Sequence, residues 1–159
     1  GGNYAGGMKA SQKAQAYHCK DVLWLDAKEH EYVEEIGTSN AFFKIGDEVI
    51  TAPLGGTILP GITRDSVITL LKEWGVPVAE RRLSLDDLFA AAKKGELKEV
   101  YATGTAAVIS PIGTLCYKGD DFVINNNEVG ALSQKLYDTL SGIQTGKIPD
   151  TRGWIERVN

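Results

Sequence analysis

Apolar residues recur with a helical period in two long segments of the chain. Residues 63–75 form a predicted amphipathic helix that ends at Gly75, and residues 130–146 form a second one that ends at Gly142 or at Gly146. The apolar face of the first helix consists of Val67, Leu70, Leu71 and Trp74. That of the second consists of Leu132, Leu136, Leu140 and Ile143. Each helix therefore has one side to bury against a core.

Capping signals predict two further helices. Residues 5–19 follow Asn3, a residue type that caps helix N-termini, although Gly6 and Gly7 each weaken a helix by roughly 1 kcal/mol relative to alanine. Ser84 precedes two aspartates that favour the first turn of a helix, and a Lys-Lys-Gly sequence supplies the matching end.

Apolar and β-branched runs between these helices predict strands. Residues 40–53 have the pattern of a β-hairpin, with two such runs joined around Gly46-Asp47. Shorter strands are predicted within residues 22–26, 31–37, 76–84 and 99–113. Strands outnumber helices and the two alternate, so the sequence predicts one domain of the α/β or α+β class.

Composition narrows the possible functions without selecting one. The chain has 159 residues, of which 43% are hydrophobic and 24% charged, as in ordinary globular domains. The net charge of −4 and the lack of a basic stripe argue against a nucleic-acid surface. The apolar runs are far shorter than the ~20 residues that cross a bilayer, so no membrane partner is expected.

Cysteine and histidine usage does not favour a metal site. Cys19 and Cys116 are far apart in the sequence, which fits free thiols in a reducing cytoplasm better than a disulfide scaffold. His18, Cys19 and His30 lack a suitably spaced fourth ligand for zinc.

Three glycine-containing stretches place polar groups at the ends of predicted elements. Pro60-Gly61 turns directly into a helix that begins near Thr63, an arrangement that suits a phosphate but also an ordinary helix start. Residues 103–106, Thr-Gly-Thr-Ala, follow a strand and allow close approach of a ligand, although such a sequence is more often a tight turn.

The third stretch is residues 32–40, with adjacent carboxylates at Glu34 and Glu35. On a strand these two side chains point to opposite faces, so one can face solvent while the other enters a site. A carboxylate held in a site requires a cationic or N–H partner. An exposed acidic edge is the alternative interpretation.

Taken in order, the motifs GGNY, EEIGTSNAFF, GTILPGITRDSVI, GTAAVISPIG and RGWIERV resemble the branched-chain amino-acid aminotransferases. These are fold-type IV enzymes that use pyridoxal 5′-phosphate (PLP). The resemblance runs from Gly1 to the C-terminus. It implies a mixed-sheet, pseudo-barrel large domain with helices packed around it, here residues 1–159. It also implies branched-chain amino acids and 2-oxo acids as substrates, 2-oxoglutarate among them, and a homodimeric parent protein.

The resemblance also implies roles for individual residues. Tyr4 corresponds to the tyrosine that hydrogen-bonds the phenolic oxygen of PLP, and Glu35, in a motif with Gly37 and Asn40, to the carboxylate that faces the pyridine nitrogen. Leu59 corresponds to the residue packed on a face of the ring. The phosphate ligands implied are Ile62, Thr63 and Thr105, and the substrate contacts implied are Thr38, Thr105 and Ala106.

Some family features have no counterpart in the sequence. The family's Schiff-base lysine precedes the GGNY motif by one intervening residue, so it is expected just upstream of Gly1, together with a smaller N-terminal domain. Lys9 and Lys13 do not match that position and are interpreted as solvated. Ser39 replaces a methionine of many relatives, and residues 107–110 lack the CxxC of some. The chain alone is therefore expected to be inactive.

Two alternatives remain from the sequence. D-amino-acid aminotransferases and aminodeoxychorismate lyases share the fold and the lysine-to-glutamate arrangement. A non-catalytic module that binds PLP or another phosphate is the alternative from a different class.

Overall fold

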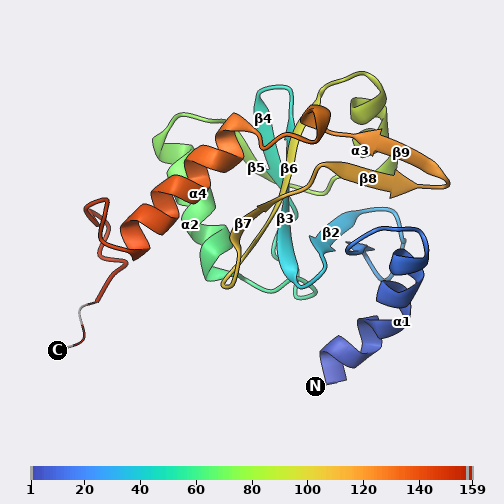
Figure 1. Cartoon of the computed structure of the whole chain (residues 1–159), viewed down its shortest axis with the longest axis horizontal. Coiled ribbons are helices and arrows are strands. Elements are labelled where there is room, and N and C mark those ends of the chain that lie inside the picture. The colour runs from blue at the N-terminus through green and yellow to red at the C-terminus, as the bar shows by residue number, and fades with distance from the viewer. Residues whose placement is uncertain (1, 157, 159) are drawn as a thin grey trace.

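A mixed sheet between two layers forms the centre of the molecule (Figure 1). The computed structural model describes residues 2–156 and 158, with side chains described from residue 5 to residue 156 and at residue 158. Helices α2 (Ile62–Glu73) and α4 (Ala131–Gln144) cover one face of the sheet. Helix α3 (Leu85–Lys93) and a separate two-stranded hairpin cover the other. Helix α1 (Gly2–Ala16) lies at one end, near the N-terminus.

The large sheet contains seven of the nine strands of the described residues, and the other two form the separate hairpin. The seven are β1 (Leu23–Leu25), β2 (Val33–Ile36), β3 (Ser39–Ile45), β4 (Glu48–Thr51), β5 (Val78–Glu80), β6 (Leu97–Gly104) and β7 (Val108–Pro111). The hairpin strands are β8 (Thr114–Tyr117) and β9 (Asp120–Val123), followed by the 3₁₀ turn η1 (Asn125–Asn127). Strands β4 and β5 are parallel, and the other pairs are antiparallel. The predicted mixed α/β class is confirmed.

Strand β3 lies at the centre of the sheet, paired with β2, β4 and β6, and both of its faces are buried. Phe42 points toward α2 and α4 and stacks on Tyr101 of β6, with ring centroids 5.3 Å apart. The next residue, Phe43, points to the opposite cluster, which includes Leu88 of α3. Successive strand residues face opposite sides of a sheet, so the adjacent phenylalanines anchor both layers.

Most predicted elements are confirmed, with two differences. Helix α1 begins at Gly2, so Asn3 lies inside the helix and does not precede it as a cap. The β8–β9 hairpin was not predicted, although its turn at Lys118-Gly119 has positive φ at both positions, a typical two-residue hairpin turn. Ser84 caps α3 as predicted, because its hydroxyl accepts the N–H of Asp87 at 3.1 Å.

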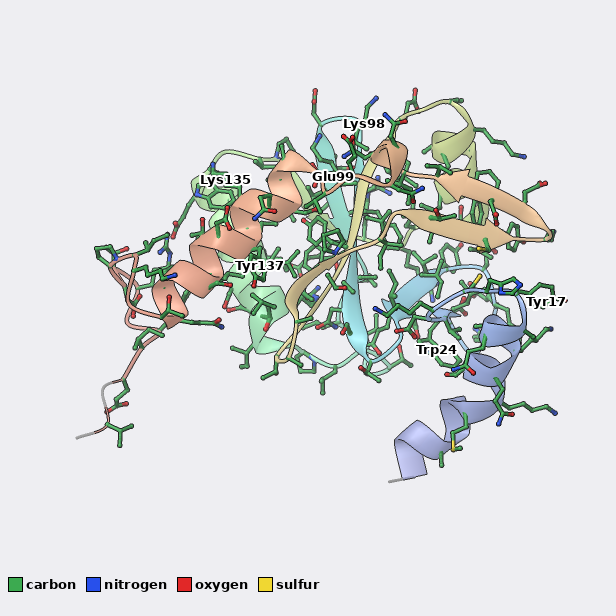
Figure 2. All side chains as sticks on the ribbon, in the orientation of Figure 1. Tyr17, Trp24, Lys98, Glu99, Lys135 and Tyr137 are labelled. Atoms are coloured by element: carbon green, nitrogen blue, oxygen red, sulfur yellow. The ribbon has the colours of Figure 1, made fainter. Side chains whose placement is uncertain are left out.

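The N-terminus of α4 is capped from a distance by Glu99 of β6 (Figure 2). This carboxylate is 7% exposed and accepts three hydrogen bonds. Its donors are the N–H groups of Leu132 at 3.0 Å and Ser133 at 2.8 Å, and the Ser133 hydroxyl at 2.5 Å. The N-cap residue, Gly130, has no side chain to do this, and a Cβ there would lie 2.0 Å from the Glu99 carboxyl carbon.

Candidate functional site

The ends of strands β2, β3 and β6 bring the candidate residues together. Asn40, at the start of β3, pairs with Thr103 near the end of β6 and with Glu35 of β2. Its side-chain amide donates to the Leu59 carbonyl at 2.9 Å and to the Glu35 carboxylate at 3.3 Å. The N–H of Leu59 donates to the same carboxylate oxygen at 3.3 Å. Asn40 is thus the residue that joins the segment before α2 to the sheet.

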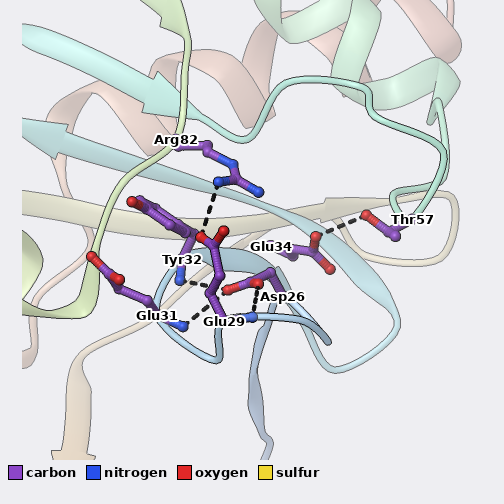
Figure 3. A network of polar contacts seen from close by, with 7 residues as sticks. All are labelled: Asp26, Glu29, Glu31, Tyr32, Glu34, Thr57 and Arg82. Atoms are coloured by element: carbon purple, nitrogen blue, oxygen red, sulfur yellow. Dashed lines mark hydrogen bonds and ion pairs between the residues drawn. The ribbon is translucent and has the colours of Figure 1, made fainter.

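Glu34 and Glu35 face opposite sides of β2, as the strand pattern predicts. The Glu34 carboxylate accepts the Thr57 hydroxyl at 2.8 Å, whereas Glu35 accepts from Leu59 and Asn40 (Figure 3 shows the Glu34 side). Partial burial raises the pKa of the Glu35 carboxyl above its ordinary value. The Leu59 N–H opposes that shift, and the Glu34 carboxylate adds to it. A cationic partner beside Glu35 would favour its ionised form.

The helix start predicted as a phosphate site has an open N-terminus. Gly61 is the N-cap of α2, and within the described residues no side-chain hydrogen bond caps this helix start. A Cβ at Gly61 would lie 2.2 Å from the Asn40 side-chain oxygen, so glycine allows the close approach. Ile62 is 83% exposed, and Thr63 is half-buried beside it. Free N–H groups at a helix start, together with a hydroxyl, suit an anionic group.

Arg64 fixes the start of α2, a role that the sequence did not reveal. Its guanidinium is buried and donates to the Ala52 carbonyl at 2.9 Å and to the Glu80 carboxylate at 2.8 Å. These contacts connect α2 to the ends of β4 and β5. The only sequence signal for this buried role is that Arg64 falls on the same predicted helix face as the apolar residues of α2.

The β6–β7 turn supplies the third part of the site. Thr105, Ala106 and Ala107 are exposed and connect Gly104 to Val108, which pair across the hairpin. Gly104 lies against Ser39, where a Cβ would come within 3.0 Å of the serine hydroxyl.

The end of strand β6 also contains a polar atom without a partner. The Thr103 hydroxyl is buried and makes no hydrogen bond within the described residues. The Tyr101 hydroxyl, on the same strand, is also buried without a partner among these residues, so the Thr103 hydroxyl does not by itself mark a ligand site.

Trp24 connects α1 to the same region. Its indole N–H donates to the Gly37 carbonyl at 2.8 Å, in the turn that follows Glu35. Its ring lies against Gly7 of α1, where a Cβ would come within 3.4 Å. This contact places the helix that contains Tyr4 beside the candidate site.

The structure brings two of the predicted site residues into direct contact and places others nearby in sequence. Glu35 and Leu59 are in direct contact, and Leu59 is 71% exposed with Ile62 and Thr63 next along the chain. Thr38 is exposed in the β2–β3 turn, and its neighbour Ser39 lies against Gly104, the residue before Thr105 and Ala106. No hydrogen bond among the described residues joins Thr63 to Thr105. The Tyr4 side chain lies outside the described residues.

A polar network on the other side of β2 closes the β1–β2 loop (Figure 3). The Asp26 carboxylate accepts the N–H groups of Glu29, Glu31 and Tyr32 at 2.6 to 2.9 Å. These bonds, that of Tyr32 above all, hold the pKa of the Asp26 carboxyl well below its ordinary value. Arg82 lies over the Tyr32 ring at 4.3 Å and pairs with Glu29. The network is structural and supports the strand that carries Glu35.

Neither a metal cluster nor a membrane-spanning helix occurs among the described residues. They contain no group of three or more His, Cys, Asp or Glu side chains suited to a metal. None of the helices described is both long and apolar enough to span a membrane. Cys19 and Cys116 are both free thiols.

The chemistry of the site fits an elongated ligand with two unlike ends. The open start of α2 offers N–H groups to an anion, and Glu35 offers a carboxylate that gains from a cationic partner. The exposed Leu59 side chain lies between these two groups along the chain and offers an apolar surface. A phosphorylated aromatic ring with a basic nitrogen has this combination of groups, so the residues present fit PLP.

Comparison with known proteins gives a consistent family. The model of the amino-transferase class IV family matches residues 1–115. The chain is 50% identical over 157 residues to branched-chain-amino-acid aminotransferase 2 of Bacillus subtilis. It is 54% identical over 153 residues to a probable branched-chain-amino-acid aminotransferase of Staphylococcus epidermidis. These alignments cover 99% and 96% of the chain but 43% of each relative, so the chain spans less than half the length of either.

Solved structures agree with this result. A branched-chain amino acid aminotransferase from Escherichia coli matches all of the chain with a TM-score of 0.81 at 30% identity, over 50% of its own length. The T.th. branched-chain amino acid aminotransferase in complex with N-(5′-phosphopyridoxyl)-L-glutamate matches all of the chain with a TM-score of 0.80 at 31% identity, over 49% of its length.

Proposed function

The chain belongs to the class IV aminotransferase family, and on that premise we propose that it is the large, PLP-binding domain of a branched-chain aminotransferase. The polypeptide that carries it would transfer the amino group of leucine, isoleucine or valine to 2-oxoglutarate. The observation that carries the proposal is the contact of Glu35 with Asn40 and Leu59, directly before the uncapped start of α2.

We assign each part of the site to one part of the cofactor. The α2 start and the Thr63 hydroxyl would bind the phosphate, together with Thr105. Glu35 would face the pyridine nitrogen and keep it protonated, and Leu59 would pack on the ring. Tyr4 would donate to the phenolic oxygen. Thr38, Thr105 and Ala106 would contact the substrate.

PLP, when bound, supplies an electron sink for the carbanion formed at the substrate α-carbon. The residues of this chain would orient it and keep it electron-withdrawing. Glu35 does this electrostatically, since a carboxylate stabilises a proton on the nearby nitrogen. Asn40 holds that carboxylate in place through its 3.3 Å bond, while its second bond, to the Leu59 carbonyl, fixes the segment before α2.

Binding of the cofactor tests the site in the chain itself. PLP is titrated into the chain while its absorbance and the quenching of tryptophan fluorescence are recorded. The expected result is saturable binding that Glu35→Gln weakens about tenfold, since a neutral amide stabilises a protonated nitrogen less. Glu34→Gln is the matched control, because that carboxylate faces the opposite side of β2. Equal weakening by both variants would contradict the assignment of Glu35.

Activity is tested in the natural polypeptide that contains the chain. Formation of glutamate from 2-oxoglutarate is measured with leucine, isoleucine, valine and D-alanine as amino donors. We expect turnover with the three branched-chain amino acids and little with D-alanine. Preference for D-alanine would instead identify a D-amino-acid aminotransferase, and release of pyruvate from aminodeoxychorismate would identify a lyase. Saturable PLP binding with no turnover on any of these would support a binding module.

The assembly and location of the protein are also part of the proposal. The resemblance supports a homodimer, which light scattering of the natural polypeptide tests. The free thiols Cys19 and Cys116 support a reducing, cytoplasmic location, which cell fractionation tests.

A further inference from the structure

Val108, the first residue of β7, has a backbone conformation that valine rarely adopts. Its φ is +58°, in the left-handed region that favours glycine. Six other described non-glycine residues have positive φ, and all are His, Lys or Asn. Val108 is β-branched, so its side chain makes this conformation more costly than in those residues.

The register of the hairpin places Val108 at the end of the turn. Gly104 pairs with Val108 and Thr103 with Ile109, which leaves the three exposed residues 105–107 as the connection. Three-residue hairpin loops usually have their left-handed residue, most often glycine, at the last loop position, here Ala107, whereas this hairpin has it one residue later, at Val108. Valine at that position requires a compensating interaction.

Packing of the side chain supplies that interaction. Val108 is half-buried and packs against the cluster between the sheet and helices α2 and α4, which includes Tyr101, Ile109 and Leu136. A glycine would avoid the strain but would have no side chain in this cluster. The valine therefore anchors the end of the turn to the core, and its backbone sets the direction in which the turn leaves β7.

We propose that Val108 is a positioning residue for the ligand site, because its packed side chain and left-handed backbone hold the turn of residues 105–107 in one orientation. This inference rests on the proposed function, in which Thr105 and Ala106 bind the anionic groups of the cofactor and substrate. Residues held in sparsely populated backbone regions cluster at such sites, where the surrounding structure maintains them. A turn ordered before binding costs less to order on binding, which increases affinity.

The inference is tested first in the ligand-free chain by ¹⁵N relaxation of the amides of residues 105–107. Order parameters near 0.85 are expected in the wild type, as for rigid backbone, and below about 0.6 in Val108→Gly. Val108→Ile keeps a β-branched apolar side chain and should therefore have the same order parameters as the wild type. Val78→Gly is the matched control, because Val78 packs against the same cluster from strand β5, away from the turn.

Affinity for PLP is the second measurement. Val108→Gly should weaken binding about tenfold, whereas Val108→Ile and Val78→Gly should bind as the wild type does. Unchanged order parameters in Val108→Gly would overturn the inference. If the wild-type chain binds PLP, an equal PLP affinity of Val108→Gly would overturn it too. If the wild-type chain binds no PLP, its assignment as a PLP-binding domain fails, and the order parameters alone then decide whether Val108 holds the turn.

Discussion

Removing the Glu99 carboxylate should destabilise the chain more than removing any exposed carboxylate. Glu99→Ala deletes the acceptor for two backbone N–H groups and one hydroxyl at the start of α4. Loss of an N-cap costs about 0.5–2 kcal/mol, and a buried donor left without a partner costs about 1–3 kcal/mol. We therefore expect a loss of about 3 kcal/mol in the free energy of unfolding. For a domain of this size that lowers Tm by about 10 °C.

Glu99→Gln separates the hydrogen bonds from the charge. The amide oxygen can still accept the two bonds from Ser133, but the NH₂ group then faces the Leu132 N–H, and the favourable interaction of a carboxylate with a helix N-terminus is lost. The expected loss is about 1–2 kcal/mol. Glu99→Ala should thus be clearly the more damaging variant.

Urea unfolding followed by tryptophan fluorescence measures both values. Glu96→Gln is the control, since Glu96 is exposed and lies just before the same strand; its unfolding midpoint should not change. A loss below about 1 kcal/mol in Glu99→Ala, or equal losses in both Glu99 variants, would refute the role of Glu99 as a distant cap.

Three further outcomes follow from individual contacts. The lowered pKa of Asp26 stabilises the fold above the ordinary carboxyl pKa of 3.8, so the stability difference between wild type and Asp26→Asn should shrink as the pH falls below that value. Gly61→Ala should displace the Asn40 amide, 2.2 Å from the new methyl group, and weaken PLP binding at least about tenfold. The Cys19 thiol, burial and a nearby carboxylate raise the pKa of the Cys116 thiol to about 12, so at pH 8 it should react with iodoacetamide more slowly than an ordinary cysteine, and faster in Cys19→Ala.

Each of these outcomes has its own measurement and control. Urea midpoints from pH 7 to pH 3 test the first, with the exposed Asp47→Asn as control; a difference that grows toward acid would contradict it. PLP titration tests the second, with Gly55→Ala, whose new methyl would meet nothing closer than 4.0 Å. Peptide mass mapping of alkylated protein tests the third, and rapid labelling of Cys116 in the wild type would show that its thiol is not held protonated.

Local patterns were sufficient where an element is defined by its own residues. The hairpin around Gly46-Asp47 and helix α2 have clear periods and turn signals, and both form as predicted. The β8–β9 hairpin is short, and β9 begins with Asp120 and Asp121, so its apolar face of Leu115, Tyr117 and Phe122 is too small to give a clear alternating pattern.

The contacts that organise the site are not local and could not be predicted in this way. Asn40 reaches Leu59, 19 residues away, and Glu99 caps a helix that begins more than 30 residues later. The sequence around one residue of each pair contains no pattern that identifies its distant partner. The backbone of Val108 is likewise a result of the β6–β7 register, since its sequence alone is typical of an ordinary strand.

The pairing of β3 with β6 has a consequence for folding. These strands are separated by more than 50 residues of sequence, and their pairing extends from Asn40 and Thr103 to Ile45 and Leu97. Closing so long a loop is slow compared with forming helices or local hairpins. The part of the site that joins β3 to β6 forms only when this pairing is complete. An intermediate with all of its helices but without this pair would therefore lack the assembled site, and the recovery of PLP binding during refolding should follow the slowest structural phase.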